Sequence, residues 1–497
     1  MIRIFNTKPM DVILGFLERC YYIFLAIILM FAAFNLFYNL GNTPISSWDE
    51  ARHGVSAFEM IKNNNYIVNT YAYSNDYWNL KPPLSYWAII AGYKLFGYNA
   101  LGLRFFSAVA ALLTILVVAR FSLIKYGRLA SLISTAALTT TMPYIVEHCA
   151  RTGDADSIFI LFFTLSIISM LMIEKNIGFL YCTGIFFAFA FLTKSWHTIS
   201  IIAIVGSYLI LSGVLFKLKA REFIIFLLSC ALPILIWGIF RFSQDGFMFF
   251  KTMIDFDLLK RTSTTLEGHI GSTSYYIENL QFGYFYWLLV LVSSVVSITL
   301  LLEPDIVNRK LFNNILAIFL WIVVPLLLYT KAKTKISWYI LPIYPALAVS
   351  LGGAVSVLLK SKKRNLVFQI LLSLMLFVSL YKNEISIINM VSYEAKDNVQ
   401  QLIKELGTMS EYRGKNIYSL YKSGSADNPD RWDQSYLLCS ELYGNMIPKE
   451  GGIKDFLEDS TDKPLFLVPR NSKYTEKLGE YNLKVVLENK SASIFTK

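Results

Sequence analysis

Residues 20–40 read CYYIFLAIILMFAAFNLFYNL, and residues 46–53 read SSWDEARH shortly after them. The first stretch carries no charge and matches the ~20 apolar residues that one membrane-spanning helix needs. The second stretch places two carboxylates, an arginine and a histidine just beyond its end, where charged groups are costly unless they have a use. This order predicts a helical membrane protein with chemistry at one membrane surface.

The composition of the whole chain agrees with lipid as its main solvent. Of its 497 residues, 55% are hydrophobic and only 16% are charged, and the mean hydropathy is +0.48. The net charge of +11 does not indicate a nucleic-acid partner, because most of the Lys and Arg residues fall in short loops between apolar runs, where they set the topology. We therefore expect the lipid bilayer as a partner and no nucleic acid.

The apolar runs predict an α-helical polytopic membrane protein with roughly eleven to thirteen spans. Charge rises again near residue 385, and short apolar strands then alternate with helical patterns. We predict a transmembrane domain over 1–384 and a small soluble α/β domain over 385–497. The expected spans are 20–40, 101–119, 128–146, 155–173, 177–193, 197–216, 222–240, 283–302, 312–330, 336–359 and 365–381.

The positive-inside rule orients these spans. One set of connections is rich in cations: Arg120, Lys125, Arg128, Lys217, Lys219, Arg221, Arg309, Lys310, Lys360, Lys362, Lys363 and Arg364. This set is expected in the cytoplasm, so the long loops 41–100 and 241–282 and the C-terminal domain are expected outside it. We predict a multi-pass protein of the bacterial inner membrane whose site faces the periplasm. The cluster Lys331, Lys333 and Lys335 is an exception on the outer side. Either the assigned topology is wrong by one span at this point, or these cations bind a membrane-embedded phosphate.

Three outer segments carry the candidate site residues. Asp49, Glu50 and Arg52 follow the first span, Lys81 opens a Lys-Pro-Pro turn, and Arg151, Asp154 and Asp156 join two later spans. Each has a plain structural alternative. Ser47, Asp49 or Asp154 suits a helix N-cap, and Lys81 suits a lysine reaching the interface from an aromatic belt. Shorter outer segments add Lys194, Arg261, His269, Lys335 and Tyr339. Their convergence on one face suits a ligand with an anionic head and a long apolar tail.

The order of these motifs resembles the GT-C-type glycosyltransferases over about residues 44–345. The motifs are Asp-Glu-Ala-Arg, Lys-Pro-Pro, Leu-x-x-Arg-Phe-x-Ser-Ala, Arg-Thr-Gly-Asp-x-Asp, Leu-Thr-Lys, His-x-Gly and Lys-x-Ser-x-Tyr-x-Leu-Pro. Within this class the chain is most similar to the lipid A aminoarabinose transferases and to bacterial enzymes like the protein O-mannosyltransferases.

The resemblance implies transfer of a monosaccharide from a polyprenyl-phosphate carrier to an extracytoplasmic acceptor: lipid A, another glycolipid, a glycan or a protein. It implies that Asp49 is the catalytic carboxylate and that the reaction inverts the anomeric carbon. Cations would stabilise the leaving lipid phosphate, and we assign that role to Lys81, Lys335, Arg52 and Lys194. Sugar or acceptor binding is assigned to Glu50, Arg151, Asp154, Asp156, Tyr339 and His269.

One position departs from the aminoarabinose transferases. They usually have Glu before Lys-Pro-Pro, and this chain has Leu80. The substitution removes one expected metal ligand and weakens the aminoarabinose assignment. A divalent metal held by Asp154, Asp156 and His269 stays an open alternative, and no other cofactor is implied.

Two other classes of membrane protein are weighed against this interpretation. A transporter or flippase usually shows internal repeats and ionisable residues at the bilayer midplane. Neither feature is visible here. An O-antigen ligase or polymerase also uses polyprenyl carriers but should lack this ordered motif set. The sequence favours the glycosyltransferase.

Overall fold

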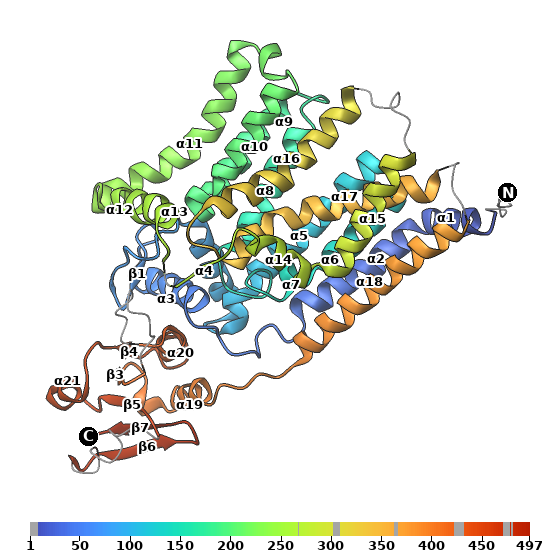
Figure 1. The fold of residues 1–497 in the computed structure, drawn as a ribbon. Helices are drawn as coiled ribbons and strands as arrows, with labels where there is room; N and C mark the ends of the chain where they lie inside the picture. The colour runs from blue at the N-terminus through green and yellow to red at the C-terminus, as the bar shows by residue number, and fades with distance from the viewer. Residues whose placement is uncertain are drawn as a thin grey trace.

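The structure, a computed structural model, describes residues 8–266, 268–301, 309–361, 366–421, 432–470, 478 and 481–497. The predicted cytoplasmic cations Lys362, Lys363 and Arg364 lie outside the described residues. A large helical bundle forms the main body, and a small sheet domain lies against one end of it (Figure 1). This is the predicted architecture of a polytopic membrane domain with a small C-terminal α/β domain.

The bundle is built from long apolar helices. They are α1 (Lys8–Arg19), α2 (Tyr21–Phe37), α4 (Leu84–Phe96), α5 (Ala100–Tyr126), α6 (Arg128–Thr139), α8 (Asp156–Leu171), α9 (Gly178–Lys194), α10 (Ile199–Leu211), α11 (Ala220–Asp245), α15 (Phe285–Leu301), α16 (Arg309–Lys331), α17 (Tyr344–Lys360) and α18 (Leu366–Ser392). Short helical turns η1 (Ser195–Thr198), η2 (Leu215–Lys217) and η5 (Ser337–Ile343) adjoin three of them.

Among the described residues, six helical stretches are long and apolar enough to cross a membrane, or up to eight if each bent pair counts as one span. This is fewer than the expected eleven to thirteen. The run 128–146 divides into the short helices α6 and α7, and the run 155–173 yields only α8, of 16 residues. The runs 177–193 and 197–216 meet through η1 in one continuous stretch, Gly178–Leu211. Hydropathy alone does not show such breaks, because apolar residues continue through them.

Close helix packing holds the bundle together. A Cβ added to Gly352 of α17 would lie 2.1 Å from Ser134 Oγ and 2.4 Å from the Ala130 carbonyl oxygen of α6. Only glycine permits this close approach of the two helices. Small residues at helix crossings are typical of membrane bundles, because helices in lipid associate through van der Waals packing and not through the hydrophobic effect.

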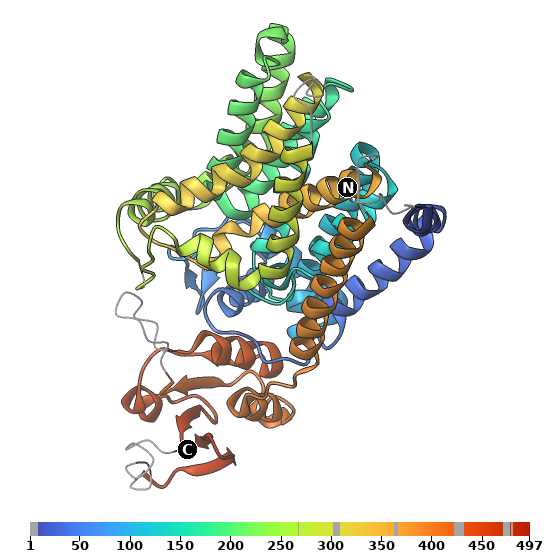
Figure 2. The same cartoon turned by 45° about the vertical axis from the view of Figure 1, so that its right-hand side comes forward.

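The shorter elements gather at the end of the bundle that faces the C-terminal domain (Figures 1 and 2). They are α3 (Asp49–Lys62), β1 (Thr70–Tyr71), β2 (Ser74–Asn75), α7 (Met142–Ile145), α12 (Met248–Thr252), the π-helical turn η3 (Met253–Lys260), α13 (Arg261–Ser263) and α14 (Tyr275–Gly283). Asn65 Nδ2 donates to Gln244 Oε1 at 2.7 Å, so the 41–100 and 241–282 segments are in contact. The two long loops therefore lie at one end of the molecule.

The C-terminal domain contains a five-stranded sheet in the order β4-β3-β5-β7-β6. The strands β3, β4 and β5 are parallel, and β7 pairs antiparallel with β5 and β6. Its elements are α19 (Asn398–Leu406), η6 (Ser410–Tyr412), β3 (Asn416–Ser419), α20 (Gln434–Gly444), β4 (Ile447–Pro448), α21 (Ile453–Glu458), β5 (Leu465–Pro469), β6 (Lys484–Glu488) and β7 (Ala492–Thr496). The predicted boundary at residue 385 falls inside α18, which continues to Ser392.

The sheet domain docks on the bundle through α20 and α3. Leu438 of α20 lies so close to Gly54 of α3 that a Cβ added there would be 2.5 Å from its Cδ2. Buried residues of both elements, including Val55, Phe58, Leu438 and Leu442, belong to one hydrophobic cluster. The C-terminal domain is thus packed directly on the helix that begins with Asp49.

Candidate active site

A cavity of about 470 Å³ opens at the start of α3. Residues from six segments of the chain, within 47–49, 78–81, 148–154, 194–197, 261–269 and 336–339, meet there. Its lining consists of Ser47, Trp48, Asp49, Trp78, Lys81, His148, Asp154, Lys194, His197, Arg261, His269, Ile336, Trp338 and Tyr339. We call this space the catalytic cavity.

Asp49 is the first residue of α3, and its carboxylate is the accessible acid of the cavity. Its side chain is 36% exposed, whereas those of Asp154 and Asp156 are at most 4% exposed. The preceding residue, Trp48, has φ 64°, a left-handed conformation that is rare for a bulky residue. Strain of this kind persists where the surrounding structure enforces it, often at functional sites.

His148 lies between the carboxylates. Its Nε2 is 3.5 Å from Asp49 Oδ2, and its Nδ1 is 3.0 Å from Asp154 Oδ2. The ring stacks on Trp338, with centroids 3.9 Å apart and planes 5° from parallel. Burial by itself would lower the pKa of His148, but the carboxylates of Asp154, Asp156 and Asp49 raise it well above its usual value. The three carboxylates therefore favour the protonated form of His148.

Three cations line the catalytic cavity. Lys81 follows the Trp78 segment, Lys194 ends α9, and Arg261 begins α13. Lys194 forms a buried ion pair with Asp156, at 2.5 Å, and Arg261 pairs with Asp257 at 3.1 Å and donates to the hydroxyl of Tyr339 at 3.2 Å. Positive charge is therefore concentrated on the wall formed by α9, α13 and the Lys81 turn.

A narrower, mostly apolar cavity of about 140 Å³ adjoins this wall. It shares His197, Arg261 and Tyr339 with the catalytic cavity and continues between Ile199 of α10 and Leu328 of α16. A ligand with its anionic group at the cations would have an apolar passage beside it.

Glu50 was expected to bind sugar or acceptor, but it is a structural residue here. Its carboxylate accepts from Arg104 Nε at 2.6 Å and Nη2 at 2.9 Å, and from the backbone of Gly153 and Ser46. Burial would raise the pKa of Glu50, but Arg104 and these two amides hold it below its usual value. The pair ties the loops around the cavity together and does not line it.

Arg52 and Arg151 also differ from their expected roles. Arg52 is buried, pairs with Asp76 through two bonds of 3.1 Å, and lies over the rings of Tyr71 and Trp78. Arg151 donates to the backbone oxygens of Asn35, Leu36 and Tyr38, at the end of α2. Neither residue lines the catalytic cavity, because each guanidinium is engaged by partners in the fold.

Lys335 was expected to share one cavity with Lys81, and the structure separates them. The ammonium of Lys335 donates to the carbonyl oxygens of Thr330 and Ala332, which end α16. Cations commonly bind the last carbonyls of a helix in this way. Tyr339 and His269 do line the catalytic cavity, as predicted.

One group of side chains in the described part of the chain has the arrangement of a metal site. The ligand atoms of Asp49, His148 and Asp154 all lie within 4.8 Å of one another. Two carboxylate oxygens and an imidazole nitrogen suit a divalent cation in kind and number. The predicted ligand set Asp154, Asp156 and His269 differs from this group, because the carboxylate of Asp156 forms an ion pair with Lys194.

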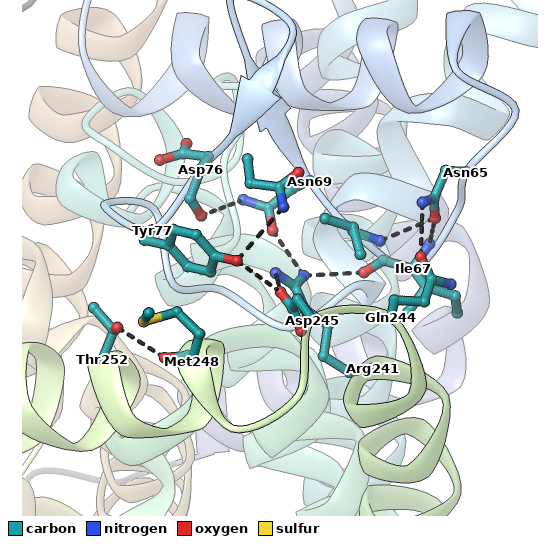
Figure 3. Close-up of polar contacts among 12 residues, drawn as sticks. Asn65, Ile67, Asn69, Asp76, Tyr77, Arg241, Gln244, Asp245, Met248 and Thr252 are labelled. Atoms are coloured by element: carbon teal, nitrogen blue, oxygen red, sulfur yellow. Dashed lines mark hydrogen bonds and ion pairs between the residues drawn. The ribbon is translucent and has the colours of Figure 1, made fainter.

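Two residues near the site were not found from the sequence. His148 lies three residues before the motif that begins at Arg151, and its position depends on Trp338, which is distant in the chain. Arg241 lies near the end of α11 and donates to Asp245 Oδ2 at 2.7 Å, to Asn69 Oδ1 at 3.1 Å and to the Ile67 carbonyl oxygen at 3.2 Å (Figure 3). It fixes the segment that leads to Trp78 and Lys81. The only sequence signal was a single arginine at the end of an apolar run, and such an arginine is equally typical of a cation that sets the orientation of a membrane span.

Comparison with known proteins supports the same class. Residues 80–237 match the family described as dolichyl-phosphate-mannose-protein mannosyltransferase. An uncharacterized protein of Aquifex aeolicus is 27% identical over 319 residues, which cover 64% of this chain and 70% of that protein. The undecaprenyl phosphate-alpha-4-amino-4-deoxy-L-arabinose arabinosyl transferase of Aeromonas hydrophila is 26% identical over 342 residues, covering 65% of this chain and 59% of that enzyme.

A solved structure matches nearly the whole fold. ArnT from Cupriavidus metallidurans, bound to undecaprenyl phosphate, superposes with a TM-score of 0.71 at 14% identity, covering 96% of this chain and 97% of that one. The chain is a glycosyltransferase with the GT-C fold. In this glycosyltransferase the family match includes Lys81, Arg151, Asp154, Asp156 and Lys194, whereas Asp49 precedes it.

Proposed function

We propose that the chain transfers a monosaccharide from a polyprenyl-phosphate carrier to an acceptor outside the cytoplasm. The observation that carries this proposal is the catalytic cavity, which is lined both by the accessible carboxylate of Asp49 and by the cations Lys81, Lys194 and Arg261. Such a site accommodates a donor whose phosphate leaves as an anion. The similarity to aminoarabinose transferases and to ArnT with bound undecaprenyl phosphate supports a carrier of this kind.

Asp49 acts as the general base. A hydroxyl of the acceptor attacks the anomeric carbon of the donor sugar, and its proton passes to the Asp49 carboxylate. The new bond joins the acceptor oxygen to the anomeric carbon, while the bond from that carbon to the carrier phosphate breaks and its electron pair leaves with the phosphate. Attack from the side opposite the leaving group inverts the anomeric carbon.

His148 and Asp154 orient the base. The imidazolium lies 3.5 Å from Asp49 and 3.0 Å from Asp154, and the stack on Trp338 fixes its plane. The two contacts hold the imidazole in a fixed position beside the Asp49 carboxylate. Asp49, His148 and Asp154 would also hold a divalent metal, which would supply the same positive charge.

The cations receive the leaving phosphate. Lys81 lies on the cavity wall, and Arg261 stands where the cavity meets the apolar passage. Lys194 is already paired with Asp156, so its contribution is shared with that carboxylate. The prenyl chain of the donor then runs along the passage between α10 and α16 into the bilayer.

The orientation follows from the charge pattern of the loops. The elements α3 and α13, which contribute Asp49 and Arg261 to the catalytic cavity, lie at the end of the bundle that faces the C-terminal domain (Figure 1). They belong to the loops that the positive-inside rule assigns outside the cytoplasm. We therefore place the site at the periplasmic face of a bacterial inner membrane.

A sugar-transfer assay with the purified protein tests the proposal. The protein in nanodiscs is incubated with an undecaprenyl-phosphate sugar labelled in the sugar, together with an extract of bacterial membrane lipids and glycans. We expect labelled product and free undecaprenyl phosphate in equal amounts. Absence of carrier release with a panel of different sugars would overturn the donor assignment, and mass spectrometry of co-purified lipid would give an independent check on the carrier.

A further inference from the structure

Three tryptophans line the catalytic cavity: Trp48, Trp78 and Trp338. One face of Trp338 is covered by the imidazole of His148, with ring centroids 3.9 Å apart. Trp48 and Trp78 lie beside each other instead, with ring centroids 6.1 Å apart and ring planes 45° apart. Both are partly exposed. These two rings, which we call the indole pair, therefore present an aromatic surface to the cavity.

The indole nitrogens of the cavity tryptophans also differ from those elsewhere in the protein. Of the nine tryptophans in the chain, five donate through Nε1 to a protein oxygen: Trp87, Trp196, Trp287, Trp321 and Trp432. Within the part of the chain that the structure describes, the Nε1 atoms of Trp48, Trp78 and Trp338 donate to no protein group. The indole pair therefore offers a ligand both an apolar face and hydrogen-bond donors.

Trp78 is held in place by buried charged groups. Its backbone N–H donates to Asp76 Oδ1 at 2.9 Å, and Arg52 donates to the same carboxylate through two bonds of 3.1 Å. The guanidinium carbon of Arg52 lies 4.5 Å from the centroid of the Trp78 ring. Since Trp78 lines the cavity and Arg52 does not, the guanidinium lies on the protein side of the ring. A ring fixed in this way is preorganised for a ligand.

Trp48 is held by its own backbone and by the C-terminal domain. It is the N-cap residue of α3, with φ 64° and ψ −122°, a conformation that favours glycine. The hydroxyl of the preceding Ser47 donates to Asp433 and Gln434 of the C-terminal domain, at 3.0 and 2.7 Å. A bulky ring therefore stands at a strained position beside the base, and such strain is commonest at functional sites.

The indole pair adjoins both groups between which the reaction takes place. Trp48 directly precedes Asp49, and Trp78 comes three residues before Lys81. All four side chains line the catalytic cavity. In the proposed reaction the anomeric carbon lies between the acceptor oxygen, activated by Asp49, and the leaving phosphate, bound by Lys81. The ring of the transferred sugar therefore lies between these two residues, beside the indole pair.

We propose that the indole pair binds the sugar of the donor and so selects a sugar-bearing carrier over the bare carrier. The C–H groups on one face of a pyranose ring pack on the electron-rich face of an aromatic ring. Hydroxyls at the edge of the sugar accept hydrogen bonds from the indole N–H groups. This inference rests on the proposed function and adds two residues that bind the transferred group. The undecaprenyl phosphate left after transfer lacks these contacts, so it competes less well with new donor.

Native mass spectrometry measures the contribution of the sugar without requiring turnover. The full-length protein in detergent receives equimolar undecaprenyl phosphate and one undecaprenyl-phosphate sugar, with glucose, mannose or 4-amino-4-deoxyarabinose as the sugar. The ratio of the two bound populations gives the relative affinity for the two lipids. We expect the wild type to favour the sugar-bearing lipid for at least one of these sugars. The sugar with the highest ratio is then used with the variants.

Variants at the two positions separate the ring face from the N–H group. Trp78→Leu removes both, and we expect it to lower the ratio by about three- to tenfold. Trp78→Phe keeps an aromatic face and should retain part of the preference. Trp48→Leu should act like Trp78→Leu, and it tests the pair independently if a variant at position 78 does not fold. Trp87→Leu is the matched control, because Trp87 lies outside the cavity and donates to the Tyr66 carbonyl oxygen at 2.7 Å.

The outcomes distinguish this inference from the proposed function. A ratio that falls in the Trp48 and Trp78 variants, with binding of undecaprenyl phosphate unchanged, would support the indole pair as the sugar site. An equal loss of both lipids would show that the tryptophans only support the segments around Asp49 and Lys81, and would overturn the inference. A wild type that binds undecaprenyl phosphate without preferring any of the three sugar-bearing lipids would overturn it too. Failure to bind any of these lipids would instead contradict the proposed function.

Discussion

The imidazole Nε2 of His148 lies 3.5 Å from the carboxylate of Asp49, although the two residues come from different loops. The contact places a partly buried imidazole beside the most exposed acid of the catalytic cavity. His148 in turn is fixed by Asp154 and by Trp338. The geometry therefore assigns the base and its orienting partner separately, and each can be tested by itself.

Substitution of Asp49 by Asn tests the base. The amide keeps the size of the side chain but cannot accept the acceptor proton, so we expect transfer to fall by about 10²–10⁴-fold. Binding of undecaprenyl phosphate should change little, because the proposed contacts of the phosphate are with the cations Lys81 and Arg261 and not with Asp49. Purified Asp49→Asn protein in nanodiscs is assayed for transfer and for carrier binding. A variant with near-normal turnover would remove Asp49 from the reaction.

Removal of metal tests the nature of the positive charge beside Asp49. We expect transfer to persist after treatment with EDTA, since the raised pKa of His148 already provides an imidazolium between Asp49 and Asp154. His148→Phe keeps the stack on Trp338 but removes both nitrogens, and it should reduce kcat more than the affinity for the donor. Metal content by mass spectrometry is measured on the same samples. Loss of activity in EDTA with recovery on adding zinc or manganese would show that Asp49, His148 and Asp154 hold an ion.

Two lysines offer a matched pair for the phosphate site. Lys81 lines the catalytic cavity, whereas the ammonium of Lys335 is bound to the carbonyl oxygens of Thr330 and Ala332. We expect Lys81→Met to raise the KM for the donor by about tenfold or more, as loss of a charge-assisted contact would. Lys335→Met should leave the donor KM nearly unchanged. A larger rise in the donor KM for Lys335→Met than for Lys81→Met would indicate that the Lys331–Lys335 cluster binds the phosphate.

Arg241 supports the segment that carries Trp78 and Lys81. Its guanidinium binds Asp245, Asn69 and the Ile67 carbonyl (Figure 3). Arg241→Met would leave Asp245 buried without this partner, and breaking a buried pair costs about 3–5 kcal/mol. We expect a clear fall in Tm, measured by fluorescence in detergent. The double variant Arg241→Met with Asp245→Leu should recover part of that stability, and no recovery would contradict the ion-pair explanation.

The sequence predicted the parts of the site that follow one another in the chain. Asp49 is recognisable because it comes shortly after an apolar run, and Lys194 is recognisable because it ends one. Pairing across the chain was not predictable. Glu50 is neutralised by Arg104, and a carboxylate next to Asp49 cannot be distinguished from a catalytic one until that partner is known. The phosphate contact of Lys335 stays a prediction: its ammonium donates to the carbonyl oxygens of Thr330 and Ala332, and a cationic cluster in the sequence suits a phosphate and a helix end equally well.

Two buried carboxyl groups at the domain interface make docking of the C-terminal domain dependent on pH. Glu59 of α3 and Glu441 of α20 are both fully buried and face one another. Burial raises the pKa of Glu59 to about 7 and that of Glu441 well above its usual value, the latter also through the charge of Glu59. An acid whose folded pKa is raised stabilises the folded state fully below its unfolded pKa, near 4.5 here, and this contribution is lost as the pH rises through the folded pKa. We therefore expect docking to weaken between about pH 5 and pH 8.

Glu441→Gln keeps the shape of the side chain and removes one titrating group, so the pH dependence of docking should flatten. Hydrogen exchange of α3 and α20 peptides across this range measures it, and identical pH profiles for wild type and variant would show that the pair does not control docking.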